Sequence, residues 1–312
     1  MRIGVQLIEL GEPAPIWTHR FEDTLEDIFD LQDRVALAVA SRIETTVQEA
    51  EIRRASARST ENLSSYDLYL RAMPPHRTVQ KEGIFEALSL LNRAIVLDPD
   101  FGQALALAAH CHMVVFDWGW SGDLDGVRRE GLDLARRALR ASGDDAVVLA
   151  RAAGVLDRRG DEPDEAITLI DRALALNPGA LTAWATSGYV RLRAGDTDLA
   201  VAHLETAMRL APASATRRTI LAFMGLGRLN QGRFGEASAL LREANQLLES
   251  PLSLGSLAAC YGHLGQIGEA QEVLARYRAQ TSQPIEEFGA AYMRDPTHRR
   301  LFLDGIALAE GA

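Results

Sequence analysis

Apolar residues recur along most of this chain at a spacing that predicts amphipathic helices. In residues 181–214, Ala200, Leu204 and Ala207 follow an i, i+4, i+7 order, which places their side chains on one face of a helix. An earlier stretch of the same window carries Trp184 and Gly188 at helical spacing. The window therefore predicts two helices, each with an apolar face that needs a partner.

Residues that break helices stand where this window needs a turn and an end. Gly195 separates the two predicted helices, and Pro212 follows the second one. A large side chain at position 184 and a small one at position 188 suit a helix that packs closely against its neighbour. The window therefore predicts one 34-residue helix–turn–helix unit.

The same order of residues returns when the window slides along the chain. Matching residues occur upstream at Ala87, Leu91, Ala94 and Pro99 and at Gly154, Ala166, Ile170, Ala173 and Pro178, and downstream at Gly225, Gly232, Ala237, Leu241, Ala244, Gly265, Ala270, Leu274 and Tyr277. One helical hairpin cannot bury its apolar face alone, whereas stacked hairpins share a continuous core. We therefore predict a mainly α fold, a solenoid of about six helical hairpins over residues 63–284.

Two units depart from the pattern. The second is about ten residues longer than the others, with Gly131 in place of an alanine and Asp144 near the expected proline. The fifth matches only after three extra residues, and an arginine stands where its large apolar residue is expected. These two units have the weakest match to the repeat.

The ends of the chain differ from the repeats. In residues 1–58, Ile3, Val5 and Leu7 alternate with Gly4 and Gln6, which predicts a strand. The text IWTHRF predicts a second strand, and a long helix follows from Thr24, so this segment is predicted to be a small α+β piece. Because an isolated hairpin is marginally stable, the piece packs on the repeats, pairs with another chain, or is the remnant of a larger domain. In residues 285–312 a final helix is expected to cover the last repeat.

These patterns resemble two known families. The recurring aromatic, glycine, alanine and proline positions resemble the tetratricopeptide repeat (TPR) family. The texts QLIEL, IWTHRF and LEDIFDLQDRVALAVA resemble the end of the TolB-like domain, which precedes such repeats in bacterial class III adenylate/guanylate cyclases and in winged-helix regulators. SYDLYLRA, LNRAIVLDPDF and RDPTHRRLFLDGI extend this resemblance. It implies a chain similar to the C-terminal part of such a protein, with a role in its regulatory system.

Composition narrows the classes of partner. The 43 acidic residues outnumber the 33 basic ones, giving a formal charge of −10, which argues against general binding to nucleic acid. Two distant cysteines predict no disulfide framework. The first residues carry no apolar stretch of signal-peptide length, and no apolar run is long enough to cross a membrane comfortably. We therefore expect a soluble, cytoplasmic protein without a membrane partner.

Motifs for catalysis are missing from the sequence. The one lysine, Lys81, is followed by Glu82, so no phosphate-binding Gly-Lys-Ser/Thr loop is present, and neither GxSxG nor HExxH occurs. His110, Cys111 and His112 stand together, but residues i and i+2 of a helix point to different faces. We therefore expect no enzyme activity, no cofactor and no metal site.

The extra residues of the long second unit are rich in aromatic side chains. Phe116, Trp118 and Trp120 lie in the text FDWGW. These rings either fill the gap that the insertion opens or form an aromatic anchor for a partner, because tryptophan is enriched in interface hot spots.

The concave face of a helical solenoid is its usual binding surface, and its first helices line it. Taking repeat positions two, five, nine, twelve and thirteen as inward-facing predicts a groove formed by Tyr69, His76, Gln103, His110, Arg151, Arg158, Arg159, Tyr189, Arg193, Asn230 and His263. Arginines gather in the middle units of this acidic protein, which favours an acidic segment as the ligand, although the same charges could simply be solvated.

These features predict a non-catalytic protein–protein interaction or regulatory scaffold that binds a protein or peptide segment in its concave groove. The N-terminal α+β piece would serve docking or a homodimer. The alternative is a regulatory C-terminal part of a class III cyclase or a transcriptional regulator, without its catalytic or DNA-binding domain. An enzyme with an unrecognised active site is the third hypothesis.

Overall fold

The computed structural model describes residues 2–8, 15–22, 35, 39, 43, 46–56, 63–160, 162–210, 216–281 and 283–311. Among these, side chains are not described at positions 2, 3, 7, 8, 16, 17, 19–22, 159 and 160. Most of the predicted helix that follows Thr24 therefore lies outside the described residues.

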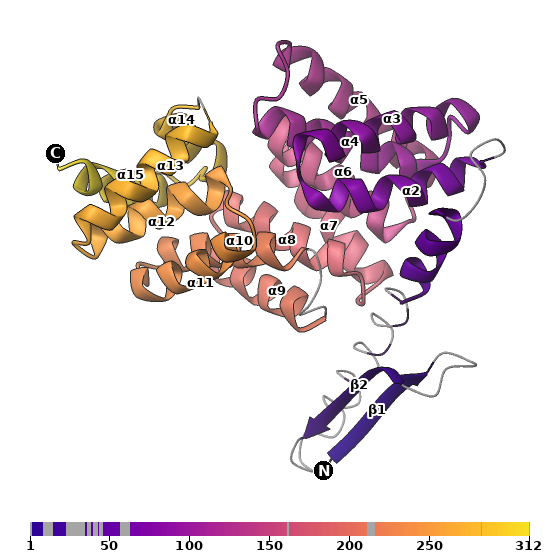
Figure 1. Cartoon of the computed structure of the whole chain (residues 1–312), viewed down its shortest axis with the longest axis horizontal. Coiled ribbons are helices and arrows are strands. Elements are labelled where there is room, and N and C mark those ends of the chain that lie inside the picture. The colour runs from indigo at the N-terminus through magenta and orange to yellow at the C-terminus, as the bar shows by residue number, and fades with distance from the viewer. Residues whose placement is uncertain are drawn as a thin grey trace.

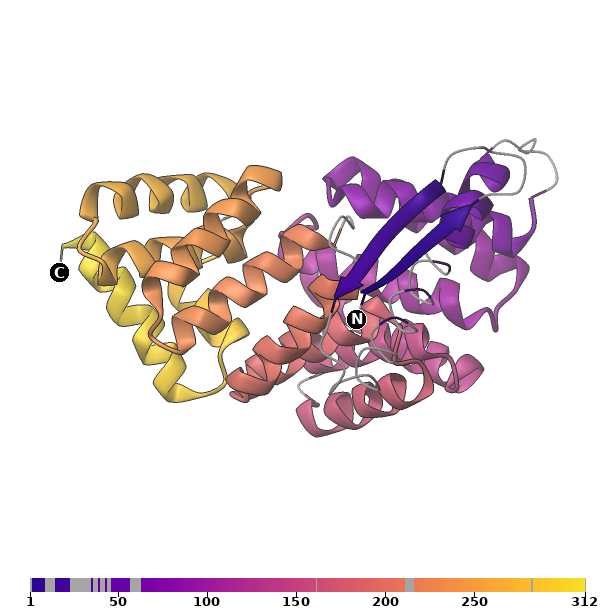
Figure 2. The ribbon, with the colours of Figure 1, turned by 90° about the horizontal axis from the view of Figure 1, so that it is seen from below.

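Helical hairpins follow one another along a curved array (Figures 1 and 2). The six pairs are α2 (Ser65–Thr78) with α3 (Lys81–Leu97), α4 (Gly102–Asp117) with α5 (Leu124–Ser142), α6 (Ala146–Val155) with α7 (Pro163–Leu176), α8 (Leu181–Ala194) with α9 (Thr197–Leu210), α10 (Arg217–Asn230) with α11 (Phe234–Leu247), and α12 (Pro251–His263) with α13 (Ile267–Gln280). The predicted helical-hairpin solenoid is therefore confirmed. We call these pairs units one to six.

Glycines end the first helices of the later units. Gly195, Gly232 and Gly265 all have positive φ, at 101°, 72° and 72°, a conformation in which a side chain is strained. In the third unit, α6 continues directly into a π-helical turn, η3 (Leu156–Gly160). This turn shapes the binding surface described below.

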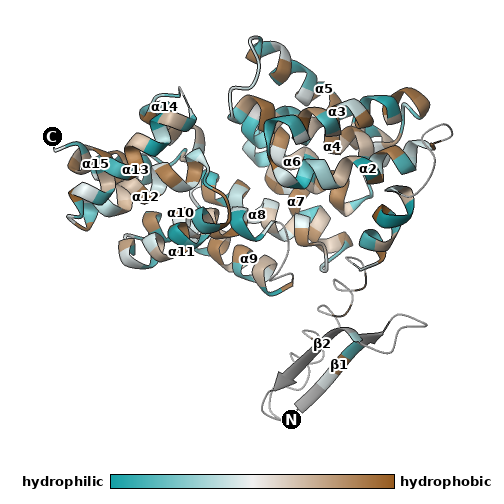
Figure 3. Cartoon of the chain, viewed as in Figure 1, coloured by the Kyte–Doolittle hydropathy of each residue, from teal (hydrophilic) through white to brown (hydrophobic). Residues whose placement is uncertain are grey.

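Small residues let the helices of each unit approach closely. Ala200, Leu204 and Ala207 are fully buried, and a Cβ added at Gly188 would overlap the Leu204 side chain. Gly225 lies against Leu241 in the same way in the fifth unit. Figure 3 shows that hydrophobic and hydrophilic residues alternate along the helices of the array.

The fifth unit corrects one detail of the sequence interpretation. Counted from Gly225, the large apolar position holds Leu221, which is 3% exposed. The three-residue insertion moves Arg218 away from that position, and Arg218 faces a pocket instead. The repeat therefore keeps its apolar position in this unit, and no arginine is forced into the core.

The N-terminal residues form a hairpin and a helical segment. Strand β1 (Arg2–Ile8) pairs antiparallel with β2 (Pro15–Glu22), with Arg2 opposite Glu22. Figure 1 shows this hairpin set apart from the array. Residues 46–56 are helical and pack against the first unit, where Ile52 and Ala55 are buried in its core.

Two helices follow the last unit, α14 (Ile285–Tyr292) and α15 (Pro296–Glu310). Helix α15 packs against α12, and the two helices cross at Gly262 and Gly305. A Cβ at Gly262 would overlap the carbonyl oxygen of Gly305, a backbone atom that cannot rotate away. The absence of side chains at this crossing therefore sets the position of α15.

We expect Gly262→Ala to lower the free energy of unfolding by about 1–3 kcal/mol, because the added methyl group overpacks the α12–α15 crossing. Gly268→Ala is the matched control, since a Cβ at Gly268 meets open space in the first turn of α13. The control should leave stability unchanged or raise it by up to about 1 kcal/mol. Urea unfolding of both variants measures the difference, and equal effects would show that the crossing is not tight.

Candidate binding pocket on the concave face

A pocket of about 530 Å³ lies on the side of the array formed by the first helices. Its walls come mainly from α2, α4, α6, α8, α10 and α12, with further residues from 48–49, η3, α9, α11 and Tyr292 at the end of α14. Five predicted groove residues line it, namely His76, His110, Arg151, Arg158 and Tyr189. Its volume is in the range of small-molecule and peptide sites.

Two histidines one repeat apart meet in this pocket. His76 Nε2 and His110 Nδ1 are 2.9 Å apart, so one nitrogen donates a hydrogen bond and the other accepts it. Burial is the largest cause that lowers the pKa of both rings, well below the usual value for His76 and to about 4 for His110. The nearby Arg151 acts in the same direction. The pair is therefore neutral at pH 7.

Three arginines from separate units face the same pocket. Arg77 lies in the last turn of α2, Arg151 in α6 and Arg218 in the first turn of α10. Arg151 donates to the hydroxyl of Tyr69 at 3.3 Å, and Arg77 donates to Gln48 Oε1 at 2.9 Å. Among the residues that the structure describes, none of the three forms an ion pair with a carboxylate. Burial lowers the pKa of Arg77 and of Arg218.

Arg158 already has partners within the protein. Its guanidinium donates to Asp117 Oδ1 at 2.8 Å and lies 4.0 Å from the centre of the Tyr292 ring, in a cation–π contact. The Arg158 side chain is 8% exposed. Arg158 therefore forms a wall of the pocket and joins the third unit to the C-terminal region.

Arg193 is also held by internal contacts. It donates to the carboxylate of Asp157 at 2.8 Å and to the carbonyl oxygen of Ala291 at 2.7 Å. Asp157 is fully buried in η3, and Arg294 lies 3.5 Å from the same carboxylate. The backbone N–H of Arg294 donates to the carbonyl oxygen of Arg193 at 3.1 Å. These contacts bind the segment between α14 and α15 to units three and four.

Tyr69, Gln103, Arg193, Asn230 and His263, which were also predicted to line the groove, lie outside the pocket. Tyr69 is buried in the core of the first unit, and Gln103 donates to Asp145 Oδ2 at 2.7 Å. Asn230 is buried, and His263 Nε2 donates to the carbonyl oxygen of Leu301 in α15 at 2.8 Å. The side chain of Arg159 lies outside the described residues.

Repeat position explains this division. His76, His110 and Tyr189 occupy position nine and line the pocket. Arg193, Asn230 and His263 occupy the later positions of their units, in the last turn of the first helix. There the chain turns toward the second helix, and the C-terminal segment covers Arg193 and His263. All three occupy position thirteen, which therefore does not face the pocket, whereas Arg158 at position twelve does.

The aromatic residues of the long second unit pack mainly against the protein itself. Trp118 and Trp120 are stacked with ring centres 5.2 Å apart, and both pack on the core of the first two units. Trp118 also lines the pocket, whereas Phe116 and Trp120 do not. Trp118 and Trp120 therefore pack on the core beside the insertion, and Trp118 adds an apolar surface to the pocket.

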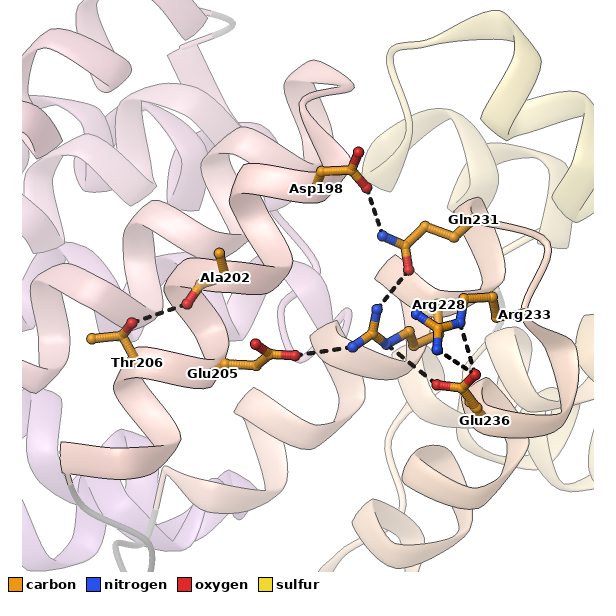
Figure 4. Close-up of polar contacts among 8 residues, drawn as sticks. All are labelled: Asp198, Ala202, Glu205, Thr206, Arg228, Gln231, Arg233 and Glu236. Atoms are coloured by element: carbon orange, nitrogen blue, oxygen red, sulfur yellow. Dashed lines mark hydrogen bonds and ion pairs between the residues drawn. The ribbon is translucent and has the colours of Figure 1, made fainter. Parts of the chain in front are cut away.

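Other arginines hold neighbouring units together on the outer side. Arg228 donates to Glu205 Oε1 at 2.9 Å and to Gln231 Oε1 at 2.8 Å, and Gln231 donates to Asp198 Oδ1 at 2.7 Å (Figure 4). These bonds connect α9 of the fourth unit with the fifth unit. Positive charge is therefore matched by carboxylates here, in contrast to Arg77, Arg151 and Arg218.

Arg77 and Arg218 were not among the predicted groove residues. Arg77 stands at repeat position ten, and Arg218 stands at position one once the insertion before the fifth unit is counted. Neither position belongs to the inward set, and both residues reach the pocket because the array curves. The unusual arginine in the fifth unit was the signal available in the sequence.

The described residues lack two further features. They contain no group of three or more His, Cys, Asp and Glu side chains that could hold a metal ion. None of the helices in the described part of the chain is long and apolar enough to span a bilayer.

Comparison with known proteins identifies the fold. No protein-family model matches the chain. A protein of Rhizobium meliloti (strain 1021) that bears the name adenylate cyclase 3 is 28% identical over 145 residues, which cover 46% of this chain and 25% of that protein. The chain thus spans about a quarter of the length of this relative.

Three solved structures have similar architecture. They are human IFIT1, solved as a dimer with m7Gppp-AAAA (TM-score 0.58, 16% identity, 73% of this chain and 53% of that one), a chain of the APC/C hetero-tetramer Cut9–Hcn1 (0.56, 15%, 90% and 49%), and the type IV pilus biogenesis factor PilW (0.50, 20%, 70% and 94%). The chain therefore has the fold of a TPR-type helical solenoid. The comparisons give no support to the resemblance to winged-helix regulators.

We expect Arg193→Ala to lower the free energy of unfolding by about 3 kcal/mol or more, because it removes a hydrogen-bonded partner of the buried Asp157 carboxylate. Arg233→Ala is the control, since Arg233 is 48% exposed and pairs with Glu236 on the surface. That change should cost less than about 1 kcal/mol. Urea unfolding at pH 7 measures both, and a small effect at Arg193 would contradict a structural role.

The histidine pair predicts a loss of stability in mild acid. Both rings have lowered pKa values in the folded state, so below pH 6.5 the unfolded chain binds protons that the folded chain does not. The contribution of the histidine pair to the free energy of unfolding is therefore fully present above pH 6.5 and decreases as the pH falls toward 4. The expected loss between pH 7 and pH 5 is up to about 2 kcal/mol for each histidine.

The measurement is urea unfolding of the wild type and of His76→Gln/His110→Gln at both pH values. The double variant should lose less stability than the wild type over this range. Equal losses would show that the pair does not resist protonation.

Proposed function

We propose that this chain is a non-catalytic interaction scaffold that binds a segment of another protein at its concave pocket. The observation that carries the proposal is the pocket itself, with walls from the first helices of all six units. A surface that draws on every unit suits a ligand that contacts several repeats at once.

The chemistry of the pocket supports a segment with both apolar and acidic groups. Met113, Trp118 and Val147 offer apolar surface, and Arg151 offers a guanidinium group without a carboxylate partner among the described residues. Arginine binds carboxylates through paired hydrogen bonds. The acidic ligand predicted from the sequence therefore depends on Arg151 and its neighbours, since Arg158 and Arg193 are occupied by internal partners.

A second candidate function is regulation of a class III adenylate/guanylate cyclase. The similarity to a protein named adenylate cyclase 3 over 145 residues favours it. In this case the bound segment would belong to the cyclase, either in the same polypeptide or in a separate one. The scaffold role is common to both candidates.

Site-specific photo-crosslinking tests the proposal. A benzophenone amino acid replaces Thr182, which lines the pocket on α8, and in a second protein it replaces Leu199, which is 39% exposed on α9. In lysate of the source organism, we expect a defined partner at position 182 and not at position 199. Mass spectrometry identifies the linked segment, and a synthetic peptide of that segment should then compete.

Equal crosslinking at the two positions, or crosslinking at position 199 alone, would contradict binding at the pocket. A linked segment from a cyclase would favour the second candidate.

A further inference from the structure

Positive charge converges in the pocket from three distant parts of the sequence. Arg77, Arg151 and Arg218 come from units one, three and five, and all three are half-buried. Burial and the neighbouring His110 lower the pKa of His76 most, and the charges of Arg151, Arg77 and Arg218 add to this effect. All three guanidinium groups therefore line the same pocket as His76 and oppose its protonation.

The surrounding charges leave this cluster incompletely neutralised. Glu49 lines the pocket and opposes the effect of burial on the pKa of Arg77. Asp117 is engaged with Arg158, so that pair contributes little net charge. Counting the described residues alone, three arginines with one nearby glutamate leave about two positive charges, which two negative charges on a ligand would balance.

The pocket also has an apolar part, and segments from both ends of the array border it. Met113, Trp118 and Val147 line it beside the arginines. Gln48 and Glu49 border it from the N-terminal helical segment, and Tyr292 borders it from the C-terminal segment. Walls on these sides enclose this part of the pocket, which suits a compact ligand there.

We propose that Arg77, Arg151 and Arg218 form a binding site for a small organic dianion, a phosphate monoester or a dicarboxylate with an apolar body. The guanidinium groups bind the oxyanion through charge-assisted hydrogen bonds, and the His76–His110 pair forms a polar surface beside it. The ligand's apolar body lies against Met113 and Trp118. This site shares Arg151 with the surface proposed above for a protein segment, and the inference does not require that such a segment binds.

Isothermal titration calorimetry of the full chain tests the site, with phenyl phosphate and phthalate as the two dianions. Benzamide serves as the uncharged control, and a capped hexaglutamate peptide represents an acidic segment. At 150 mM NaCl and pH 7.5, we expect at least one dianion to bind with a Kd below about 1 mM and benzamide not to bind. The dianion that binds distinguishes phosphate from dicarboxylate recognition.

Three variants locate the binding. Arg151→Gln and Arg218→Gln should each weaken dianion binding by roughly tenfold or more, because each removes a charged donor. Arg233→Gln makes the same change of net charge on the surface, next to Glu236, and should bind as the wild type does. Without ligand, Arg218→Gln should melt at the same temperature as the wild type or higher, because a desolvated cation without an ion-pair partner is removed.

Two results would overturn the proposal. One is that neither dianion binds at 5 mM, and the other is that the arginine variants bind as tightly as the wild type. In the first case, binding of hexaglutamate would show that the site is an anchor for acidic segments. The crosslinking experiment at Thr182 is independent of both results, so the scaffold function and the dianion site can fail separately.

Discussion

The structure depends on the close approach of helices whose apolar faces cannot be buried alone. In each hairpin of residues 63–281, the two helices bury their apolar faces against each other and against the next unit. Small residues at the crossings allow the helix axes to approach closely enough for this packing. Where Gly188 meets Leu204 and Gly225 meets Leu241, a methyl group on the glycine would separate the helices. The curvature of the array, and with it the pocket, follows from the repetition of these crossings.

The pocket is a product of this curvature. Arg77 and Arg218 are 141 positions apart in the sequence, yet both line the same pocket and both act on His76. Regular stacking brings them together because each unit adds a small rotation to the previous one. Residues that no local motif connects can in this way form one chemical site.

The sequence was sufficient to predict the helices, and it predicted part of the pocket. The glycine at 195 and the stripe of Ala200, Leu204 and Ala207 are local signals, and the structure confirms their roles. His76 and His110 were predicted because they share one repeat position. The roles of Arg193 and Arg218 could not be predicted from period alone. The role of Arg193 depends on a contact with a segment about 100 residues later in the chain. The role of Arg218 depends on the curvature of the array and on a three-residue insertion.

The C-terminal segment changes the kind of unfolding that this solenoid can undergo. In an open array each unit contacts only its neighbours, so the ends can fray one unit at a time. Here Arg294 contacts Asp157 across 137 residues, and α15 packs on α12. The C-terminal segment therefore contacts both unit three and unit six, and these contacts close units three to six into a loop. Releasing any unit inside this loop requires breaking the closure first, which favours cooperative unfolding of the C-terminal two thirds of the array and leaves gradual fraying to the first two units.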